Sequence, residues 1–257
     1  MTSTHTILRS IVLAAAALAC SVTATPALAG GFSWFGGEHV QGNGKIVHQT
    51  RELGHFTALA TSVGGNIEVR IGNTESVSIE TDDNLMPLVE TVIENGTLRI
   101  RPAKRDMQLD TRTMKIVVQA KAVDHISVAG SGSVEAAHLS GDKLLFDVGG
   151  SGSIALSDLH SAAVNVSLGG SGNLQASGSA EHLHVSIGGS GRVQTGQLET
   201  RDAVVNIGGS GQATVWVRQT LNVSVAGSGD IGYYGDPQVT KNVMGSGSVK
   251  RLGGAPQ

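Results

Sequence analysis

The side chains in this sequence that could do chemistry are few and are spread along a repetitive chain. His182 and His184 lie two residues apart, so on a strand they share one face, and Asp202 falls in the next repeat. Two imidazoles and a carboxylate can ligate zinc, but two solvent-exposed histidines on an outer strand face explain the pattern more simply. The sequence therefore predicts no metal ion and no other cofactor.

Three aromatic residues near the repeats could serve a different chemistry, the binding of sugars. Trp216 lies between apolar alternates, so its side chain is expected to point outward, and Tyr233 and Tyr234 follow in the next repeat. An outward indole can stack on a sugar ring or pack beneath a loop. Sugar-cleaving β-helix enzymes also need clustered carboxylates, whereas Asp147 and Asp202 fall in repeats that are not neighbours. We therefore predict no catalytic residue and regard the three aromatics as a candidate ligand-binding surface.

A Gly-Ser-Gly phrase follows a short, mostly β-branched run seven times. Its glycines form no phosphate-binding loop, since neither G-x-x-x-x-G-K-[ST] nor G-x-G-x-x-G occurs between a strand and a helix. An aliphatic residue replaces the aspartate of calcium-binding repeats, and no G-x-S-x-G element presents a serine nucleophile. Seven equivalent serines are better explained as a ladder of structural corners: Ser131, Ser151, Ser171, Ser190, Ser210, Ser228 and Ser246.

The residues around these serines align in columns with a period of 18 to 20 residues. A fixed period of this size marks units that are unstable alone and stack on one another. The positions three before and three after the serine are apolar in all seven copies, and the position four before it is Ser, Asn or Asp. Alternation with a period of two places the apolar columns inside and the polar column outside. The flanking glycines suit sharp corners with positive φ.

The period also predicts the architecture. About nineteen residues at roughly 3.3 Å each trace a loop of about 60 Å, which suits a three-sided coil. We therefore predict an all-β fold, a single-stranded parallel β-helix, with about seven regular coils in residues 123–252 and less regular capping coils in 47–122. An antiparallel sheet or barrel with Gly-Ser-Gly hairpins is an alternative, but segments such as QASGSAEHL are poor strands. A leucine-rich repeat would need a Leu/Asn frame, which is absent.

The predicted capping region contains three local signals. Ser62-Val63-Gly64-Gly65 resembles a degenerate copy of the repeat. Asp82-Asp83-Asn84 precedes a short apolar stretch and could cap a turn of helix. Asn95-Gly96 between two strand-like runs predicts a tight hairpin, because both residues tolerate positive φ.

Residues 1–29 have the pattern of a secretory signal peptide: Arg9, a short apolar stretch over 11–22, and Ala27-Leu28-Ala29 as the cleavage site. Cleavage after Ala29 would remove Cys20, the only cysteine; lipid attachment at Cys20 is the alternative. The mature chain would carry 17 basic and 21 acidic residues, which argues against nucleic acid as a partner. It has no apolar run long enough for a membrane helix. We expect a Gly-rich linker over 30–46 and the β-helix domain over 47–257.

Three segments in this order resemble the GIN-domain family of bacterial proteins, named as head domains of autotransporter adhesins and without an assigned function. They are RELGHFTALATSVGGNIEVRIG, TDDNLMPLVETVIENGTLRIRP and IGYYGDPQVTKNVMGSGSVKRLG. The resemblance covers nearly all of the chain from Arg51 onward. It implies a right-handed, single-stranded β-helix of the cell envelope, and it brings no known catalytic or binding residues.

The sequence thus favours an exported, non-enzymatic protein of the periplasm, outer surface or medium, whose polar faces bind glycans or envelope proteins. A carbohydrate-active β-helix enzyme and a purely structural envelope spacer are the alternatives. A groove with three or more convergent ionisable groups would favour the enzyme, and a smooth ladder would favour binding or structure. The oligomeric state is left open.

Overall fold

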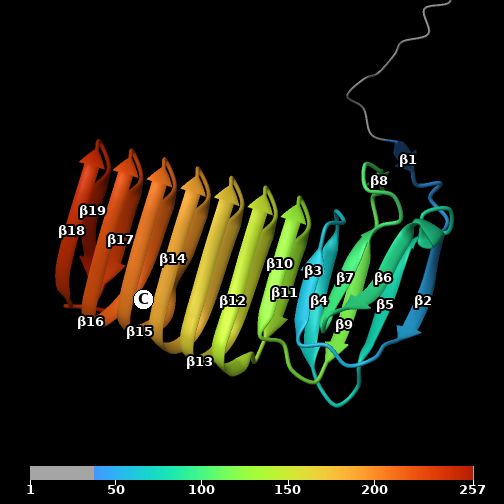
Figure 1. Cartoon of the computed structure of the whole chain (residues 1–257), viewed down its shortest axis with the longest axis horizontal. Helices are drawn as coiled ribbons and strands as arrows, with labels where there is room; N and C mark the ends of the chain where they lie inside the picture. Colours follow the sequence, from blue (N-terminus) through green and yellow to red (C-terminus); the bar gives the residue numbers. More distant parts are fainter. Residues whose placement is uncertain (1–37, 257) are drawn as a thin grey trace, which may run out of the picture. The chain divides into compact units, whose positions relative to one another are not determined.

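A computed structural model describes residues 38–256, and most of this part of the chain is β-strand (Figure 1). From His125 onward, successive coils stack in parallel and in register, which confirms the predicted parallel β-helix. The seven Gly-Ser-Gly corners bound six full windings, from Ser131 to Ser246. The strands are β10 (His125–Gly130), β11 (Ser133–Ala137), β12 (Ser140–Gly150), β13 (Ser153–Gly170), β14 (Asn173–Gly189), β15 (Arg192–Gly209), β16 (Gln212–Gly227), β17 (Asp230–Tyr234), β18 (Gln238–Gly245) and β19 (Ser248–Gly253).

The core is a stack of single-residue columns, one residue from each coil. The two predicted apolar columns are confirmed: all members are buried except Val243 and Val249, which lie in the last coil and are partly buried. A third column contains Phe146, one of the largest fully buried side chains. Most other core residues are Val, Ile, Leu or Ala, so the interior is long and narrow.

The glycine before each central serine has a positive φ, from +98° at Gly130 to +134° at Gly189. Consecutive corners touch through backbone atoms: a Cβ on Gly170 would lie 2.6 Å from the carbonyl oxygen of Gly150. Ser171 donates its backbone N–H to this carbonyl oxygen at 2.9 Å, and the same bond recurs at the next corners. Glycine is therefore required at this position both for φ and for space.

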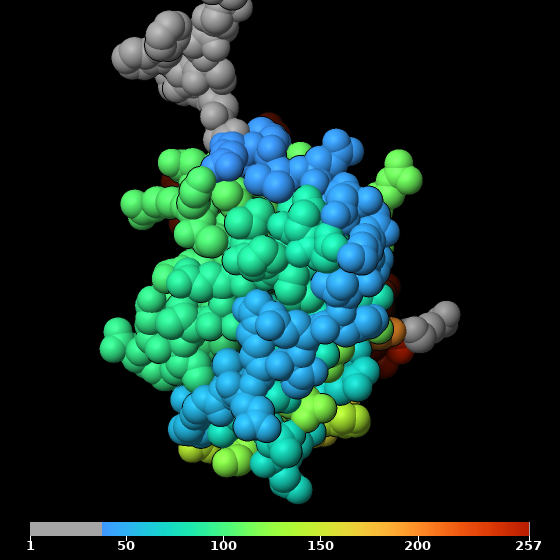
Figure 2. Space-filling view, turned by 90° about the vertical axis from the view of Figure 1, so that its right-hand side faces the viewer, coloured from blue at the N-terminus to red at the C-terminus, as the bar shows by residue number. Residues whose placement is uncertain are grey.

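The N-terminal coils continue the stack and then close it. The Ser62-Val63-Gly64-Gly65 segment stacks on the first regular corner, with Thr61 beside Val128 and Asn66 beside Ser133, as expected of a degenerate copy. Three antiparallel pairings then finish this end, and Figure 2 shows it covered by residues from the N-terminal part of the chain. The strands are β2 (Ile46–Glu52), β3 (Ala58–Thr61), β4 (Asn66–Ile71), β5 (Ser76–Asp82), β6 (Val89–Glu94), β7 (Thr97–Pro102) and β9 (Lys115–Ala120).

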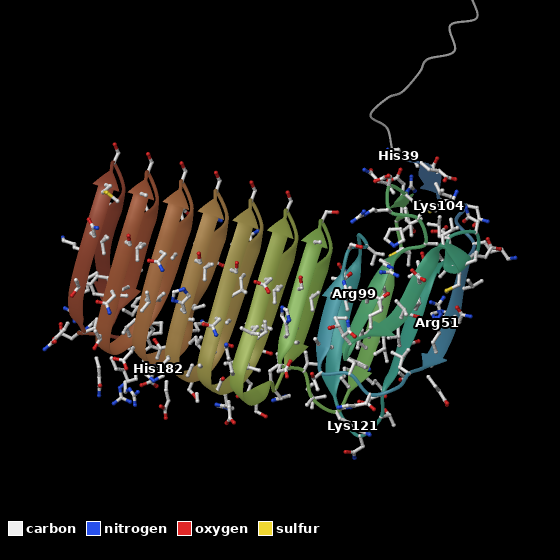
Figure 3. All side chains as sticks on the ribbon, in the orientation of Figure 1. His39, Arg51, Arg99, Lys104, Lys121 and His182 are labelled. Atoms are coloured by element: carbon white, nitrogen blue, oxygen red, sulfur yellow. The ribbon has the colours of Figure 1, made fainter. Side chains whose placement is uncertain are left out.

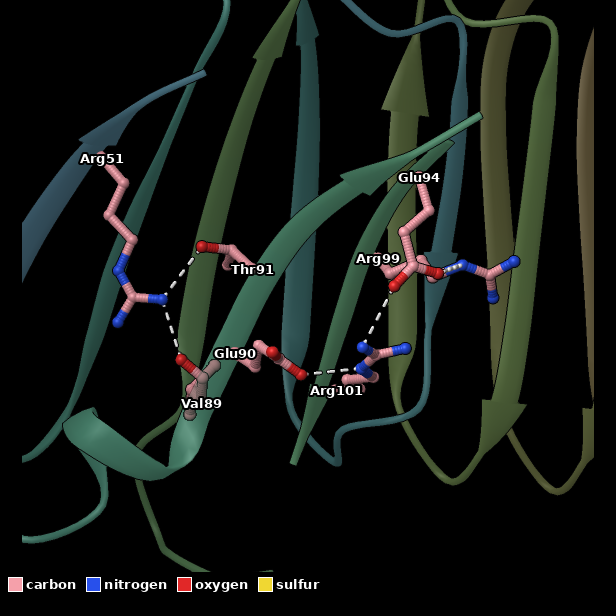
Figure 4. Close-up of polar contacts among 7 residues, drawn as sticks. All are labelled: Arg51, Val89, Glu90, Thr91, Glu94, Arg99 and Arg101. Atoms are coloured by element: carbon pink, nitrogen blue, oxygen red, sulfur yellow. Dashed lines mark hydrogen bonds and ion pairs between the residues drawn. The ribbon is translucent and has the colours of Figure 1, made fainter. Parts of the chain in front are cut away.

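The closed N-terminal end is held by a half-buried cation and by ion pairs (Figure 4). Arg51 donates to the carbonyl oxygen of Val89 at 2.8 Å and to the hydroxyl of Thr91 at 3.0 Å, which joins β2 to β6. Burial lowers the pKa of Arg51. On the β6–β7 hairpin, Arg101 pairs with Glu90 at 2.8 Å and with Glu94 at 3.2 Å. The hairpin turns at Asn95-Gly96, with φ of 52° and 75°, as predicted.

Two expectations for this region are wrong. The apolar stretch after Asn84 does form a turn, the 3-10 helix η1 (Met86–Leu88), but no side chain caps it. The carboxylate of Asp82 accepts bonds from the Gly44 N–H and the Thr111 hydroxyl instead, because it points back to other segments. Within the described residues, the end of the predicted linker is also structured: β1 (His39–Gln41) pairs in parallel with β8 (Gln108–Asp110). The predicted signal peptide lies outside the described residues.

Adjacent glycines at one corner allow a matched test of the stacking. We expect Gly170→Ala to lower the free energy of unfolding by more than about 2 kcal/mol, because the methyl group meets the Gly150 backbone and φ is +120°. Gly169→Ala should change it by less than about 0.5 kcal/mol, since a Cβ there has no neighbour within 4 Å and Ala129 and Ala226 occupy this position in other coils. Urea unfolding measures both; equal losses would contradict the stacking.

Candidate functional site

One outer row of side chains brings most of the chemically capable residues of the solenoid together. Each member is the register partner of the next in the adjacent coil, so neighbours are about 4.8 Å apart along the solenoid. The row starts just after the second corner of the coil, the turn that follows β11 at His138. We call it the second-corner row, and it consists of Ser140, His160, Ser179, Glu199, Trp216 and Tyr234.

The aromatic end of this row contains two of the three predicted ligand-binding residues. Trp216 lies between the buried Val215 and Val217, so it points outward as expected, and it is half-buried. Tyr234 is its register partner and is also half-buried. The ring of Tyr234 lies toward Gly196, where an added Cβ would come within 3.3 Å of it. The two rings therefore form one outward aromatic patch.

Tyr233 lies on the other side of the strand. It is the register partner of the fully buried Val215 and packs against the core. Neighbours along a strand face opposite sides, so Tyr233 and Tyr234 cannot both belong to an outer surface. Tyr233 is partly buried and packs against the core near the end of the solenoid, and this corrects its assignment to the ligand-binding surface.

The middle of the row carries paired charges. The carboxylate of Glu199 lies 3.1 Å from the guanidinium of Arg218, and both side chains are exposed. The hydroxyl of Thr200, itself buried, donates to the carbonyl oxygen of Trp216 at 2.7 Å. This bond fixes the backbone of the tryptophan where the two coils differ in length. The aromatic patch is thus adjacent to a carboxylate and a guanidinium.

The other end of the row is a chain of imidazole, carboxylate and hydroxyl groups. His138 Nδ1 lies 2.6 Å from one oxygen of Asp158, and His160 Nε2 lies 3.1 Å from the other. His160 Nδ1 lies 2.9 Å from the hydroxyl oxygen of Ser179. The hydrogen bond from His138, aided by His160, lowers the pKa of Asp158. Asp158 is therefore ionised at neutral pH.

A groove of about 470 Å³ lies beside this chain, on the outer face of β4, β11, β13 and β14. Its lining includes Ala137, Ala155 and His138. Its ionisable groups also include Glu68, Glu135 and Arg70. Arg70 binds both carboxylate oxygens of Glu68, at 2.6 and 2.9 Å, and the hydrogen bond from Arg70 lowers the pKa of Glu68. Among residues 38–256, no ion-pair partner lies close to Glu135.

The first histidine of the pair that suggested a metal site, His182, has other partners. His182 is exposed on the outside of the solenoid (Figure 3). Its Nε2 lies 2.9 Å from a guanidinium nitrogen of Arg201, and its Nδ1 lies 3.5 Å from the carboxylate of Asp202. A guanidinium beside the imidazole repels a metal cation, and Asp202 already pairs with Arg201 at 3.0 Å. In the part of the chain that the structure describes, no cluster of three His, Cys, Asp or Glu side chains could hold an ion.

The sequence alone did not reveal most of the second-corner row, because its residues lie at different distances from the Gly-Ser-Gly serine in different coils. His160 lies nine residues after its serine, Ser179 eight and Trp216 six. The coils lose residues between the corner and the row, as the register shifts after Gln175 and Thr195 show. The shortening of the period from 20 to 18 residues was visible in the sequence, but not where in the coil it occurs.

Comparison with known proteins assigns the family. Residues 55–237 match the family described as "Putative auto-transporter adhesin, head GIN domain", and the chain belongs to this family, as the sequence motifs indicated. A comparison with curated proteins finds no match. Among residues 38–256, no helix is long and apolar enough to cross a membrane.

Solved structures share the fold at low identity. A "putative adhesin" of Bacteroides fragilis superposes with a TM-score of 0.76 at 23% identity, over 83% of this chain and 100% of the other. A "putative lipid binding protein" of Parabacteroides distasonis gives 0.69 at 24%, over 84% and 100%. A "putative adhesin" of Parabacteroides merdae gives 0.66 at 23%, over 84% and 99%.

Truncation of the two adjacent tyrosines should lower stability by different amounts. We expect Tyr233→Ala to lower the free energy of unfolding by about 2 kcal/mol or more, because it empties part of the core. Tyr234→Ala should cost at least about 1 kcal/mol less, because the ring lies on the outer face. Thermal and urea unfolding of the two variants give the comparison. A larger loss in Tyr234→Ala would show that the row is part of the core instead.

Proposed function

We propose that this chain is an exported, non-enzymatic module of the bacterial cell envelope that binds an extended glycan or protein along the second-corner row and the adjoining groove. The observation that carries the proposal is the row itself. It aligns an aromatic patch, a paired carboxylate, hydroxyls and an imidazole at one residue per coil. Regular spacing of this kind suits a polymer whose own units repeat.

The composition of the row supports binding by many weak contacts. Aromatic faces contribute apolar stacking, while Ser179, His160 and Glu199 offer hydrogen bonds to hydroxyl or amide groups. Each exposed contact is weak, because water competes with it. Several contacts along one ligand, and several copies of the protein on one surface, add up to useful avidity.

Three observations support a location in the cell envelope. The predicted signal peptide over residues 1–29 supports export, and the family description names adhesin head domains. Two of the solved structures with this fold are also named as adhesins. Fractionation of cells that express the full chain, followed by mass measurement of the mature protein, tests export and cleavage after Ala29 together.

Binding should depend on the aromatic patch. On a glycan array and in pull-down assays with envelope proteins, we expect the double variant Trp216→Ala/Tyr234→Ala to reduce the signal at least tenfold. The control is Met244→Ala, which removes an apolar side chain that is 61% exposed at a Gly-Ser-Gly corner. Equal loss in the control, or full binding by the double variant, would exclude the row as the site. An absence of any ligand for the wild type would favour a spacer.

One observation keeps a carbohydrate-active enzyme as the second candidate. The groove contains Glu68, Glu135, Arg70 and His138, which meets the count of ionisable groups expected of an enzyme. However, Glu68 is held ionised by Arg70, whereas a glycosidase acid needs a raised pKa. The Asp158–His160–Ser179 chain is ordered like a nucleophile with its base, but His160 and Asp158 are both more than half exposed.

The enzymatic candidate has its own test. We expect no new reducing ends and no released acyl groups when the protein is incubated with a panel of plain and acetylated bacterial and plant polysaccharides. Product formed by the wild type but not by Glu135→Gln would assign a glycosidase or lyase. Product lost in Ser179→Ala would assign an esterase. Either result would replace the non-enzymatic proposal.

A further inference from the structure

The last coil that the structure describes has an open edge. Among residues 38–256, β18 pairs only with β16, and β19 pairs only with β17. Their outer sides therefore present free backbone N–H and C=O groups, which are a template for another strand. The apolar columns also reach this edge, where Val239, Val243 and Val249 are only partly buried. Figure 1 shows both strands at the end of the stack.

One core column is apolar in every coil except the last, where its member is charged. Each of its members is the register partner of the next, and all the apolar members are buried. In the last coil the same position is occupied by Lys241, the partner of Val223, and Lys241 is exposed. The column runs Leu98, Leu59, Ile126, Phe146, Val166, Val185, Val205, Val223 and Lys241.

A second core column changes in the same way. Val215 is fully buried, its partner Tyr233 is partly buried, and the next partner is the exposed Arg251. The guanidinium of Arg251 donates to the carbonyl oxygen of Gly235 at 2.7 Å and lies 3.5 Å from the carboxylate of Asp236. Both partners belong to the turn after β17, the strand on which β19 stacks, so the side chain bends back onto the preceding coil.

We infer that Lys241 and Arg251 prevent a second copy of this chain from stacking on the C-terminal end of the solenoid. A coil added at about 4.8 Å would cover both side chains and remove their water. None of the ion pairs within residues 38–256 involves Lys241, so the ammonium would be buried without a counter-charge. Burial of an unpaired charge is strongly unfavourable. Inward-pointing charges on an edge strand are a known means of preventing edge-to-edge association.

The two ends of the solenoid are therefore closed by different means. Antiparallel strands cover the N-terminal end, whereas two cations in core columns protect the C-terminal end. This inference concerns self-association and does not depend on the ligand proposed above.

The chain offers a matched control for charge. Lys250 lies between Val249 and Arg251 but on the outer side of β19, as the register partner of Gly232. Lys143 in β12 is exposed as well. The double variant Lys143→Val/Lys250→Val thus loses the same charge and gains the same valines as Lys241→Val/Arg251→Val, but outside the core columns. Circular dichroism and thermal unfolding first establish that both variants fold.

Sedimentation velocity over a concentration series measures the association. We expect the wild type and the control to remain monomeric, and Lys241→Val/Arg251→Val to associate at a concentration at least tenfold lower than either. Hydrogen exchange of β18 and β19 amides should slow only in the associating variant. A monomeric Lys241→Val/Arg251→Val variant overturns the inference. So does equal association of the control, or a wild type that already associates with protected β18 and β19 amides.

Discussion

Backbone contact between stacked coils at the Gly-Ser-Gly corner is the constraint on which the rest of this structure depends. From Gly150 onward, the glycine before each serine lies directly on its counterpart in the preceding coil, where even a methyl group would meet a carbonyl oxygen. This contact fixes the spacing between neighbouring coils at the Gly-Ser-Gly corner. Each coil must therefore repeat the side-chain pattern of the coil beneath it. The narrow core of small aliphatic columns follows, because each column can accept only residues of similar size and polarity.

The same stacking determines what kind of surface the protein can offer. An outward position repeats at every coil, so chemistry accumulates along rows rather than around a single cavity. The second-corner row and the groove beside it lie away from the glycine ladder, where coil lengths differ and the register shifts. His138 and Asp158 adopt positive φ at this corner, where Gly178 follows in the next coil. Differences in coil length are tolerated at the second corner, because contacts at the Gly-Ser-Gly corner already fix the spacing of the coils.

A repetitive stack must also end, and here the two ends differ in physical kind. At the N-terminal end the chain folds back on itself, and antiparallel strands with an exposed outer face supply the missing partner. At the C-terminal end no further strand is supplied within the described residues, and the last coil instead places Lys241 and Arg251 in core columns. Covering an edge and charging it are alternative answers to the same problem of unpaired backbone groups.

The sequence alone determined the repeat, the inward and outward alternation around each serine, and the parallel stack. These follow from local spacing near Ser131 and its counterparts. Tertiary structure alone decided which residues meet beyond the second corner. Coils there differ in length, so the partnership of Glu199 with Trp216 and the inward position of Tyr233 depend on where residues are lost from each coil. The sequence did not predict the inward position of Lys241 either. A charged residue in a strand is expected to face outward, and only the register with Val223 places Lys241 in a core column.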